Sequence, residues 1–76
     1  MEILFSDDFK EGSKNEMFTV FRINSNLYQA KSDWQVIILW KVDNRWEGVS
    51  NTSENAFISV IGQYIDKFYS TGVQFT

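Results

Sequence analysis

The chain has 76 residues, a formal net charge of −3 and a sequence pI of about 4.7. It contains no Cys and no His, which excludes disulfides and thiolate metal sites and removes the commonest general base and metal ligand. A chain this short forms one domain near the lower size limit for independent folding. With disulfides and thiolate metal sites excluded, association with another chain is the remaining way to add stability to such a domain.

The first residues lack the basic start and long apolar run of a secretory signal, and no apolar run approaches the roughly 20 residues of a membrane span. We therefore expect a cytoplasmic, complete small gene product with a single domain over residues 1–76. Its expected parts are an N-terminal strand and loop segment (1–16), a β-meander (17–50) and a C-terminal helix (53–70).

The N-terminal segment begins with a short apolar run, residues 2–5, which predicts an edge strand. Ser6 is a candidate N-cap for about one and a half turns of helix, with Gly12 as a left-handed residue at its end. The polar residues 12–16 predict a loop.

Alternation of apolar and polar side chains predicts strands over residues 17–23 and 27–31. A two-residue loop between them places Phe21 opposite Ala30. A three-residue loop would place Phe21 opposite Gln29 and mix polar with apolar side chains on one face. Because register follows the hydrophobic pattern, we expect the two-residue loop.

Residues 34–42 form the central predicted strand, and their middle is apolar on both faces, as in a strand that is buried on both sides. A turn over residues 31–33 would place Ala30 opposite Trp34. A second turn over residues 43–45 would start a last strand, 46–50, with Gly48 opposite Trp40.

Residues 53–70 predict an amphipathic helix, with Thr52 or Ser53 as the N-cap and Gly72 as the stop. One helical face collects Phe57, Val60, Ile61, Tyr64, Ile65 and Phe68. Gly62 is unusual there, since glycine destabilises a helix by roughly 1 kcal/mol relative to alanine; it marks either a tolerant position or the close approach of another backbone. Asn51-Thr52-Ser53 also matches the N-glycosylation triplet. We expect these residues to cap the helix rather than to carry a glycan.

The change of period from 2 to 3.6 near Asn51 predicts an α+β fold: an antiparallel β-meander of about four strands, followed by one helix on one face of the sheet. The larger and more aromatic face is expected under the helix. Its members are Met17, Phe21, Ile23, Tyr28, Ala30, Trp34, Val36, Ile38, Trp40, Val42 and Trp46.

The second face is the predicted protein interface, because one helix cannot cover both faces and a rimmed apolar patch usually marks an interaction site. The interface residues are Phe18, Val20, Arg22, Leu27, Ile37, Leu39, Lys41 and Val49. Two coverings stay open: a second copy or a different protein, or the N-terminal segment through Ile3, Leu4, Phe5 and Phe9.

No catalytic residue, cofactor site or metal site is predicted. The acids fall in turns, in the N-terminal segment and on the polar side of the helix, and the spacing Asp7-Asp8-x-x-Glu11 is a weak cation motif in a solvated segment. The glycines are too scattered for a phosphate loop.

The sequence therefore predicts a non-catalytic protein-binding module that forms a homodimer. Its size and composition suit a small accessory or inhibitory protein of the kind that phages and mobile elements encode. The alternative is a single-stranded nucleic-acid-binding protein in which Arg22 and Lys41 line the sheet beside Phe18, although the acidic balance weighs against it.

Overall fold

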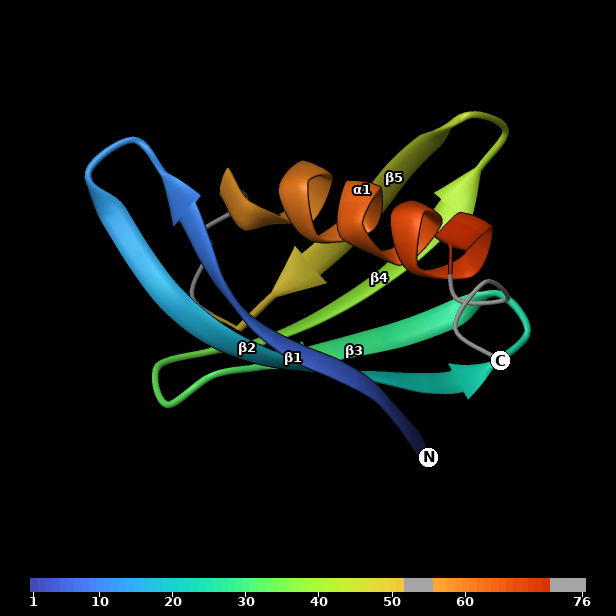
Figure 1. The fold of residues 1–76 in the computed structure, drawn as a ribbon, viewed down its shortest axis with the longest axis horizontal. Helices are drawn as coiled ribbons and strands as arrows, with labels where there is room; N and C mark the ends of the chain where they lie inside the picture. Colours follow the sequence, from blue (N-terminus) through green and yellow to red (C-terminus); the bar gives the residue numbers. More distant parts are fainter. Residues whose placement is uncertain (52–55, 72–76) are drawn as a thin grey trace.

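The computed structural model describes residues 1–51 and 56–71 as a five-stranded antiparallel sheet with one helix. The strands are β1 (Glu2–Glu11), β2 (Lys14–Asn24), β3 (Leu27–Lys31), β4 (Val36–Val42) and β5 (Arg45–Ser50), and each pairs with its neighbours in chain order. Helix α1 (Ala56–Thr71) lies in the hollow of the curved sheet (Figure 1). The predicted α+β class is confirmed, with five strands in the meander rather than about four.

Residues 2–11 form a strand, so the prediction of a short helix from Ser6 is wrong, and the loop predicted over residues 12–16 is only a turn at Gly12 and Ser13. β1 and β2 pair from Glu2 to the turn at Gly12 and Ser13. Gly12 does adopt the predicted left-handed conformation, with φ 63°. This glycine lies in the turn of the β1–β2 hairpin instead of ending a helix. Side chains alternate between the two faces along β1, so the rings of Phe5 and Phe9 both point toward α1.

The hydrophobic core forms between α1 and one face of the sheet. Its buried members are Phe9, Phe18, Val20, Tyr28, Ala30, Ile37 and Leu39 from the strands, and Phe57, Ile58, Ile61 and Ile65 from the helix. The rings of Phe18 and Phe57 meet edge to face with centroids 5.2 Å apart. Burial of each large side chain contributes roughly 1.5–3 kcal/mol, which makes this layer the main source of stability.

The predicted assignment of the two faces is wrong, and a β-bulge explains the error. Asn24 pairs with Leu27 across the expected two-residue loop, but the register then shifts, so that Phe21 lies opposite Gln29. Because side chains alternate along a strand, a shift of one residue moves Tyr28 and Ala30 to the face that carries Phe18 and Val20.

The other two turns also differ from the prediction in register, the β3–β4 turn by three residues and the β4–β5 turn by one. Lys31 pairs with Val36, which leaves Trp34 in the β3–β4 loop, and Arg45 pairs with Val42. The second turn holds Asp43 at φ 56°, a left-handed conformation that Asp tolerates. As a result the side chain of Trp46 lies on the helix side of the sheet.

Gly48 lies opposite Leu39 rather than Trp40. Asn51 ends β5 by bonding to Val36 with both its backbone and its side chain: its N–H donates to the Val36 carbonyl (3.2 Å), and its Oδ1 accepts from the Val36 N–H (3.0 Å). The predicted caps at Thr52, Ser53 and Gly72 lie outside the described residues. Within residues 1–51 and 56–71, no helix has both the length and the apolar character needed to cross a bilayer.

Candidate functional site: the open face of the sheet

The side chains that point away from α1 form what we call the open face. Cross-strand pairing places on it Ile3, Ser6, Asp8, Met17, Thr19, Phe21, Leu27, Gln29, Lys31, Val36, Ile38, Trp40, Val42, Glu47 and Val49. Ile3, Met17 and Val49 are 65%, 60% and 58% exposed, respectively. No described helix or strand packs on this face, which leaves an extended apolar surface on one side of a small domain.

A shallow concavity of about 260 Å³ lies at one end of the open face. Met17, Thr19, Phe21 and Lys31 line its strand side, and Ser32 and Asp33 of the β3–β4 loop close it. The concavity therefore joins the apolar strands to the loop that carries Trp34.

Charges on and beside the open face balance. The residues are Asp8, Lys10, Lys31, Asp33, Arg45 and Glu47, three acids and three bases. Arg45 Nε lies 2.9 Å from Glu47 Oε2, which pairs two of the six. The chain has a formal charge of −3, so its acidic excess lies elsewhere.

The centre of the predicted interface is buried inside the domain. Phe18, Val20, Ile37 and Leu39 are each fully inaccessible beneath α1, so the prediction that they form an exposed interface is wrong. The helix packs on these strands because they offer an unbroken apolar surface, while the opposite face carries Gln29 at its middle.

The remaining predicted interface residues lie at margins of the two faces. Arg22 and Lys41 are half-buried on the helix side of the sheet, where Arg22 pairs loosely with Glu2 (3.8 Å). Leu27 and Val49 belong to the open face.

The N-terminal segment does not cover either face as a flap. β1 extends the sheet beside β2, and its Phe9 is 1% exposed against α1. Phe5 stacks near Phe68 with ring centroids 5.5 Å apart. Ile3 itself lies on the open face, so this alternative is also wrong for the described residues.

The β3–β4 loop presents Trp34 at 78% exposure, contrary to its predicted place in the core. A hydrogen-bonded network holds the loop. Ser32 Oγ donates to Glu16 Oε2 and accepts from the backbone N–H groups of Trp34 (3.0 Å) and Gln35 (3.1 Å). Gln35 Nε2 donates to Glu16 (3.1 Å), and Gln35 Oε1 accepts from Ser50 Oγ (2.9 Å). The exposed indole therefore stands on a loop that is fixed at several points.

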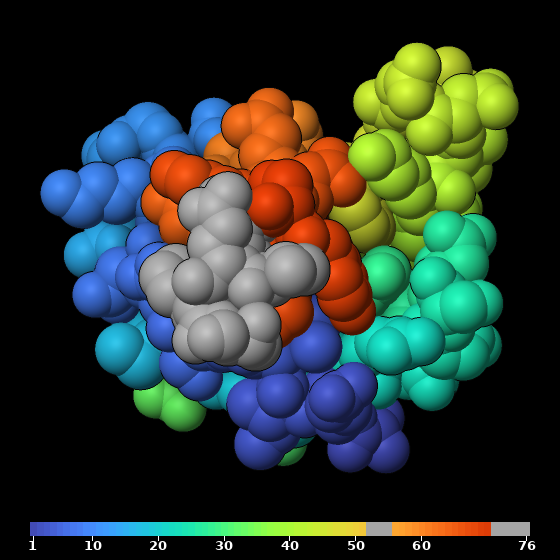
Figure 2. Space-filling view, turned by 45° about the vertical axis from the view of Figure 1, so that its right-hand side comes forward, coloured from blue at the N-terminus to red at the C-terminus, as the bar shows by residue number. Residues whose placement is uncertain are grey.

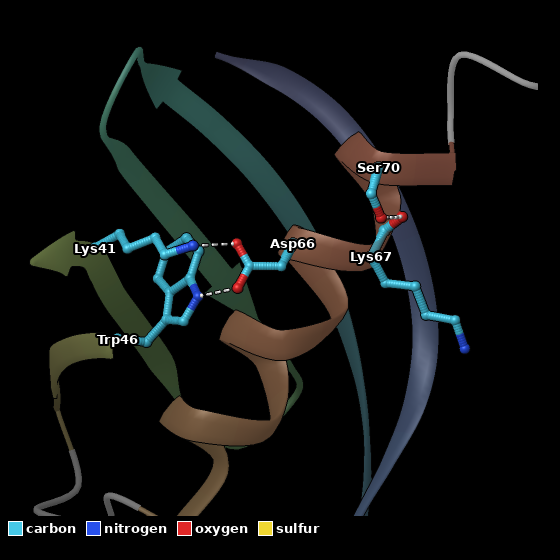
Figure 3. Close-up of polar contacts among 5 residues, drawn as sticks. All are labelled: Lys41, Trp46, Asp66, Lys67 and Ser70. Carbon is cyan, nitrogen blue, oxygen red and sulfur yellow. Dashed lines mark hydrogen bonds and ion pairs between the residues drawn. The ribbon is translucent and has the colours of Figure 1, made fainter. Parts of the chain in front are cut away.

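Asp66 joins α1 to the end of the β4–β5 hairpin (Figure 3). Its two carboxylate oxygens accept from Lys41 Nζ (2.8 Å) and Trp46 Nε1 (3.0 Å). Partial burial works to raise the pKa of this carboxyl, but the bonds from Lys41 and Trp46 outweigh it and leave the pKa below its usual value. Lys41 is thus committed to a structural contact within the domain.

The indole of Trp46 also explains Gly62. A Cβ at Gly62 would lie 2.1 Å from Trp46 Cγ, so no larger residue fits there without movement of the ring. The close approach that the sequence suggested comes from a side chain of the same domain.

The chemistry of the described residues offers no metal centre. Residues 1–51 and 56–71 contain no group of three or more His, Cys, Asp or Glu side chains placed to hold a metal ion. Asp7 and Asp8 are neighbours on β1, so their side chains point to opposite faces, and Asp7 Oδ1 accepts from the Asp8 N–H (2.8 Å).

Comparison with known proteins identifies no relative: no family model matches the chain, and neither a curated protein nor a solved structure is significantly similar to it. The candidate site therefore depends on the geometry of this structure alone.

Proposed function

We propose that the protein is a non-catalytic protein–protein interaction module that associates with a second copy of itself through the open face. The observation that supports this proposal is the exposure of Ile3, Met17 and Val49 on the side of the sheet opposite the helix. Two sheets that pack face to face bury such side chains in a layer about 10 Å thick, with strand directions about 30° apart.

The size of the open face supports a second copy as the occupant. The molecule measures 34 × 23 × 23 Å, so a face that spans its long axis and one short axis presents roughly 800 Å² in plan. A standard interface buries about 800 Å² of each partner. A copy that covers the open face therefore reaches the area of a specific contact.

The charge distribution supports the same occupant. Two chains of net charge −3 repel each other on average, but the open face and its rim balance acids with bases. Trp34 adds an exposed aromatic residue on a fixed loop, which is the type of residue that dominates binding energy at interfaces.

A role as an accessory or inhibitory protein belongs to this proposal. A different protein with a complementary apolar surface would compete with the second copy for the open face. Binding by surface complementarity requires none of the reactive groups that the chain lacks.

The proposal is tested by placing a charged side chain on the open face and measuring the mass of the protein in solution. Phe21→Glu is expected to halve the mass measured by light scattering, because a carboxylate cannot be buried in an apolar contact. Gln63→Glu is the matched control: it makes the same charge change on the exposed side of α1 and is expected to leave the mass unchanged. An unchanged mass for a folded Phe21→Glu variant would contradict the proposal.

Single-stranded nucleic-acid binding is the second candidate, and one observation favours it: Phe21 and Trp40 share the open face with Lys31. Bases stack on such rings, and the affinity falls steeply with salt. Salt-dependent binding of an oligonucleotide that is lost in Phe21→Glu would support this candidate over the first.

A further inference from the structure

We propose that Trp34 of each copy inserts its indole into the concavity at the end of the open face of the other copy, so that two such contacts anchor the pair. This inference rests on the proposed face-to-face association and names the residues that hold it. The concavity is the one lined by Met17, Thr19, Phe21, Lys31, Ser32 and Asp33. Trp34 and all of these lining residues belong to the described part of the chain.

Trp34 is exposed and held in place. Its side chain is 78% exposed and takes no part in the lining of the concavity, so it does not fill the concavity of its own copy. The β3–β4 loop that carries it lies at one end of the sheet (Figure 1). The Ser32 N–H donates to the Gln35 carbonyl (3.0 Å), and the Trp34 N–H donates to Ser32 Oγ (3.0 Å). A side chain on a loop that is fixed in this way loses less freedom when it binds.

The concavity is large enough for an indole. A cavity of roughly 150 Å³ holds a benzene ring, and the concavity measures about 260 Å³. Phe21 and Met17, which is 60% exposed, supply its apolar walls. An indole in this space would remove its own apolar surface and that of Met17 from water together. Such mutual burial is what makes an aromatic anchor strong.

The charged residues of the lining suit the remaining chemistry of an indole. A cation is attracted to the face of the ring, and the ring N–H needs an acceptor when it is buried. Lys31 offers an ammonium group and Asp33 a carboxylate. Among residues 1–51 and 56–71, neither group is engaged in an ion pair or a side-chain hydrogen bond. Their charges cancel, so the contact adds no repulsion between two acidic chains.

The molecule already holds one of its own indoles with the same two kinds of group. Trp46 lies in the β4–β5 hairpin, whose end stands out from the body of the molecule (Figure 2). Its Nε1 donates to Asp66 (3.0 Å), and Lys41 Nζ lies 5.9 Å from the centroid of its ring. With Lys31 and Asp33, the concavity repeats at the surface the pairing of ammonium and carboxylate that surrounds Trp46.

The position of Trp34 next to the concavity makes a second copy the occupant that fits. Ser32 and Asp33 of the lining directly precede Trp34 in the chain. In a two-fold contact, a residue and the site that it fills lie on either side of the axis. The concavity lies over β2 and β3, and the loop leads from β3 to β4. An axis along the strands between β3 and β4 therefore brings Trp34 to the concavity of the other copy and brings the two open faces together.

Trp34→Ala tests the anchor, and because this side chain is exposed, the variant is expected to keep its fold. One indole at the centre of an interface contributes roughly 30-fold in affinity, so loss of both is expected to raise the dissociation constant of the pair roughly 1,000-fold. Sedimentation of a dilution series measures this constant. Trp34→Phe keeps a ring but loses the N–H, and its constant is expected to fall between the two. Gln63→Ala, on the exposed side of α1, is the control that is expected to change nothing.

A mixture of two impaired variants tests whether the contact is reciprocal. Thr19→Arg fills the concavity with a long charged side chain and is expected to give single copies where the unmodified protein pairs. Thr19→Ala loses the same bond to Ser6 (2.9 Å) but leaves the concavity open, so it is the matched control and is expected to pair normally. The Trp34→Ala copy keeps its concavity, and the Thr19→Arg copy keeps its indole. Mixed pairs with one filled concavity are therefore expected to be roughly 30-fold tighter than pairs of either variant alone, and native mass spectrometry identifies them.

The outcomes separate this inference from the proposed function. An unchanged dissociation constant for Trp34→Ala overturns the anchor and, where Phe21→Glu still gives single copies, leaves the face-to-face association standing. If both variants are impaired and their mixture forms no mixed pairs, the reciprocal contact is overturned. An unmodified protein that stays a single copy at every concentration overturns both proposals.

Discussion

The two faces of the sheet both carry large apolar side chains, and they differ in what lies between those side chains. Beneath α1, the positions from Phe18 and Val20 across to Ile37 and Leu39 hold no polar side chain. Across the middle of the open face run Thr19, Gln29 and Lys31. To bury an amide or an ammonium group without partners costs several kcal/mol. The helix therefore packs on the uniform face, which also carries more of the aromatic side chains.

The largest expected effect comes from truncating neighbours on opposite faces of β4. Leu39→Ala is expected to lower the free energy of unfolding by about 2–5 kcal/mol, because it opens a cavity under α1. Ile38→Ala, one residue away on the open face, is expected to cost roughly 1 kcal/mol or less in a single copy, because no described element of the chain covers that face. Denaturant titration at a protein concentration low enough to separate the copies measures both. Equal losses under that condition would contradict the difference between the two faces.

A smaller effect is expected where α1 meets Trp46. Gly62→Ala would normally stabilise a helix by roughly 1 kcal/mol. Here the new Cβ meets the indole, so we expect a net loss of about 1–3 kcal/mol. Thermal unfolding measures the change. In a Trp46→Leu background, Gly62→Ala should lower the stability by less than it does in the unmodified protein. An equal loss in both backgrounds would show that the indole ring is not the obstacle.

The smallest effect is a pH dependence at Asp66. The pKa of this carboxyl is lowered in the folded state, so its contribution to stability is complete above the unfolded pKa and is lost as the pH falls below about 4. The carboxyl is 46% exposed, so the contribution is about 1 kcal/mol or less. Asp66→Asn should flatten stability below pH 4. Lys41→Met should raise the pKa of Asp66 in an NMR titration, and an unmoved pKa would contradict the assigned cause.

Local patterns were sufficient to predict the α+β class, the apolar side of α1 and four of the strands. Phe57, Ile61 and Ile65 pack as the helical spacing predicts. Only the first residues of β1 were predicted as a strand, because Ser6, Asp7 and Asp8 also suit the start of a helix. Pairing with β2 is what makes these residues a strand.

The candidate site was placed on the wrong face because register depends on features that are weak in the sequence. The bulge after Arg22 has no glycine to mark it, and the turn at Asp43 holds two residues where three were expected. The sequence did contain one signal of the correct register. Tyr28 and Ala30 make a purely apolar surface with Phe18 and Val20, whereas the register that we expected places them on the other face of the sheet. Uniformity of a face, rather than its size, predicts which face is covered.

The three tryptophans give the molecule a set of built-in optical reporters. Trp46 donates to Asp66 against the helix, Trp40 lies half-exposed on the open face, and Trp34 stands in solvent on its loop. Their emission and quenching therefore distinguish unfolding of the domain from contact at its surface. One unlabelled sample can follow both processes as the concentration is varied.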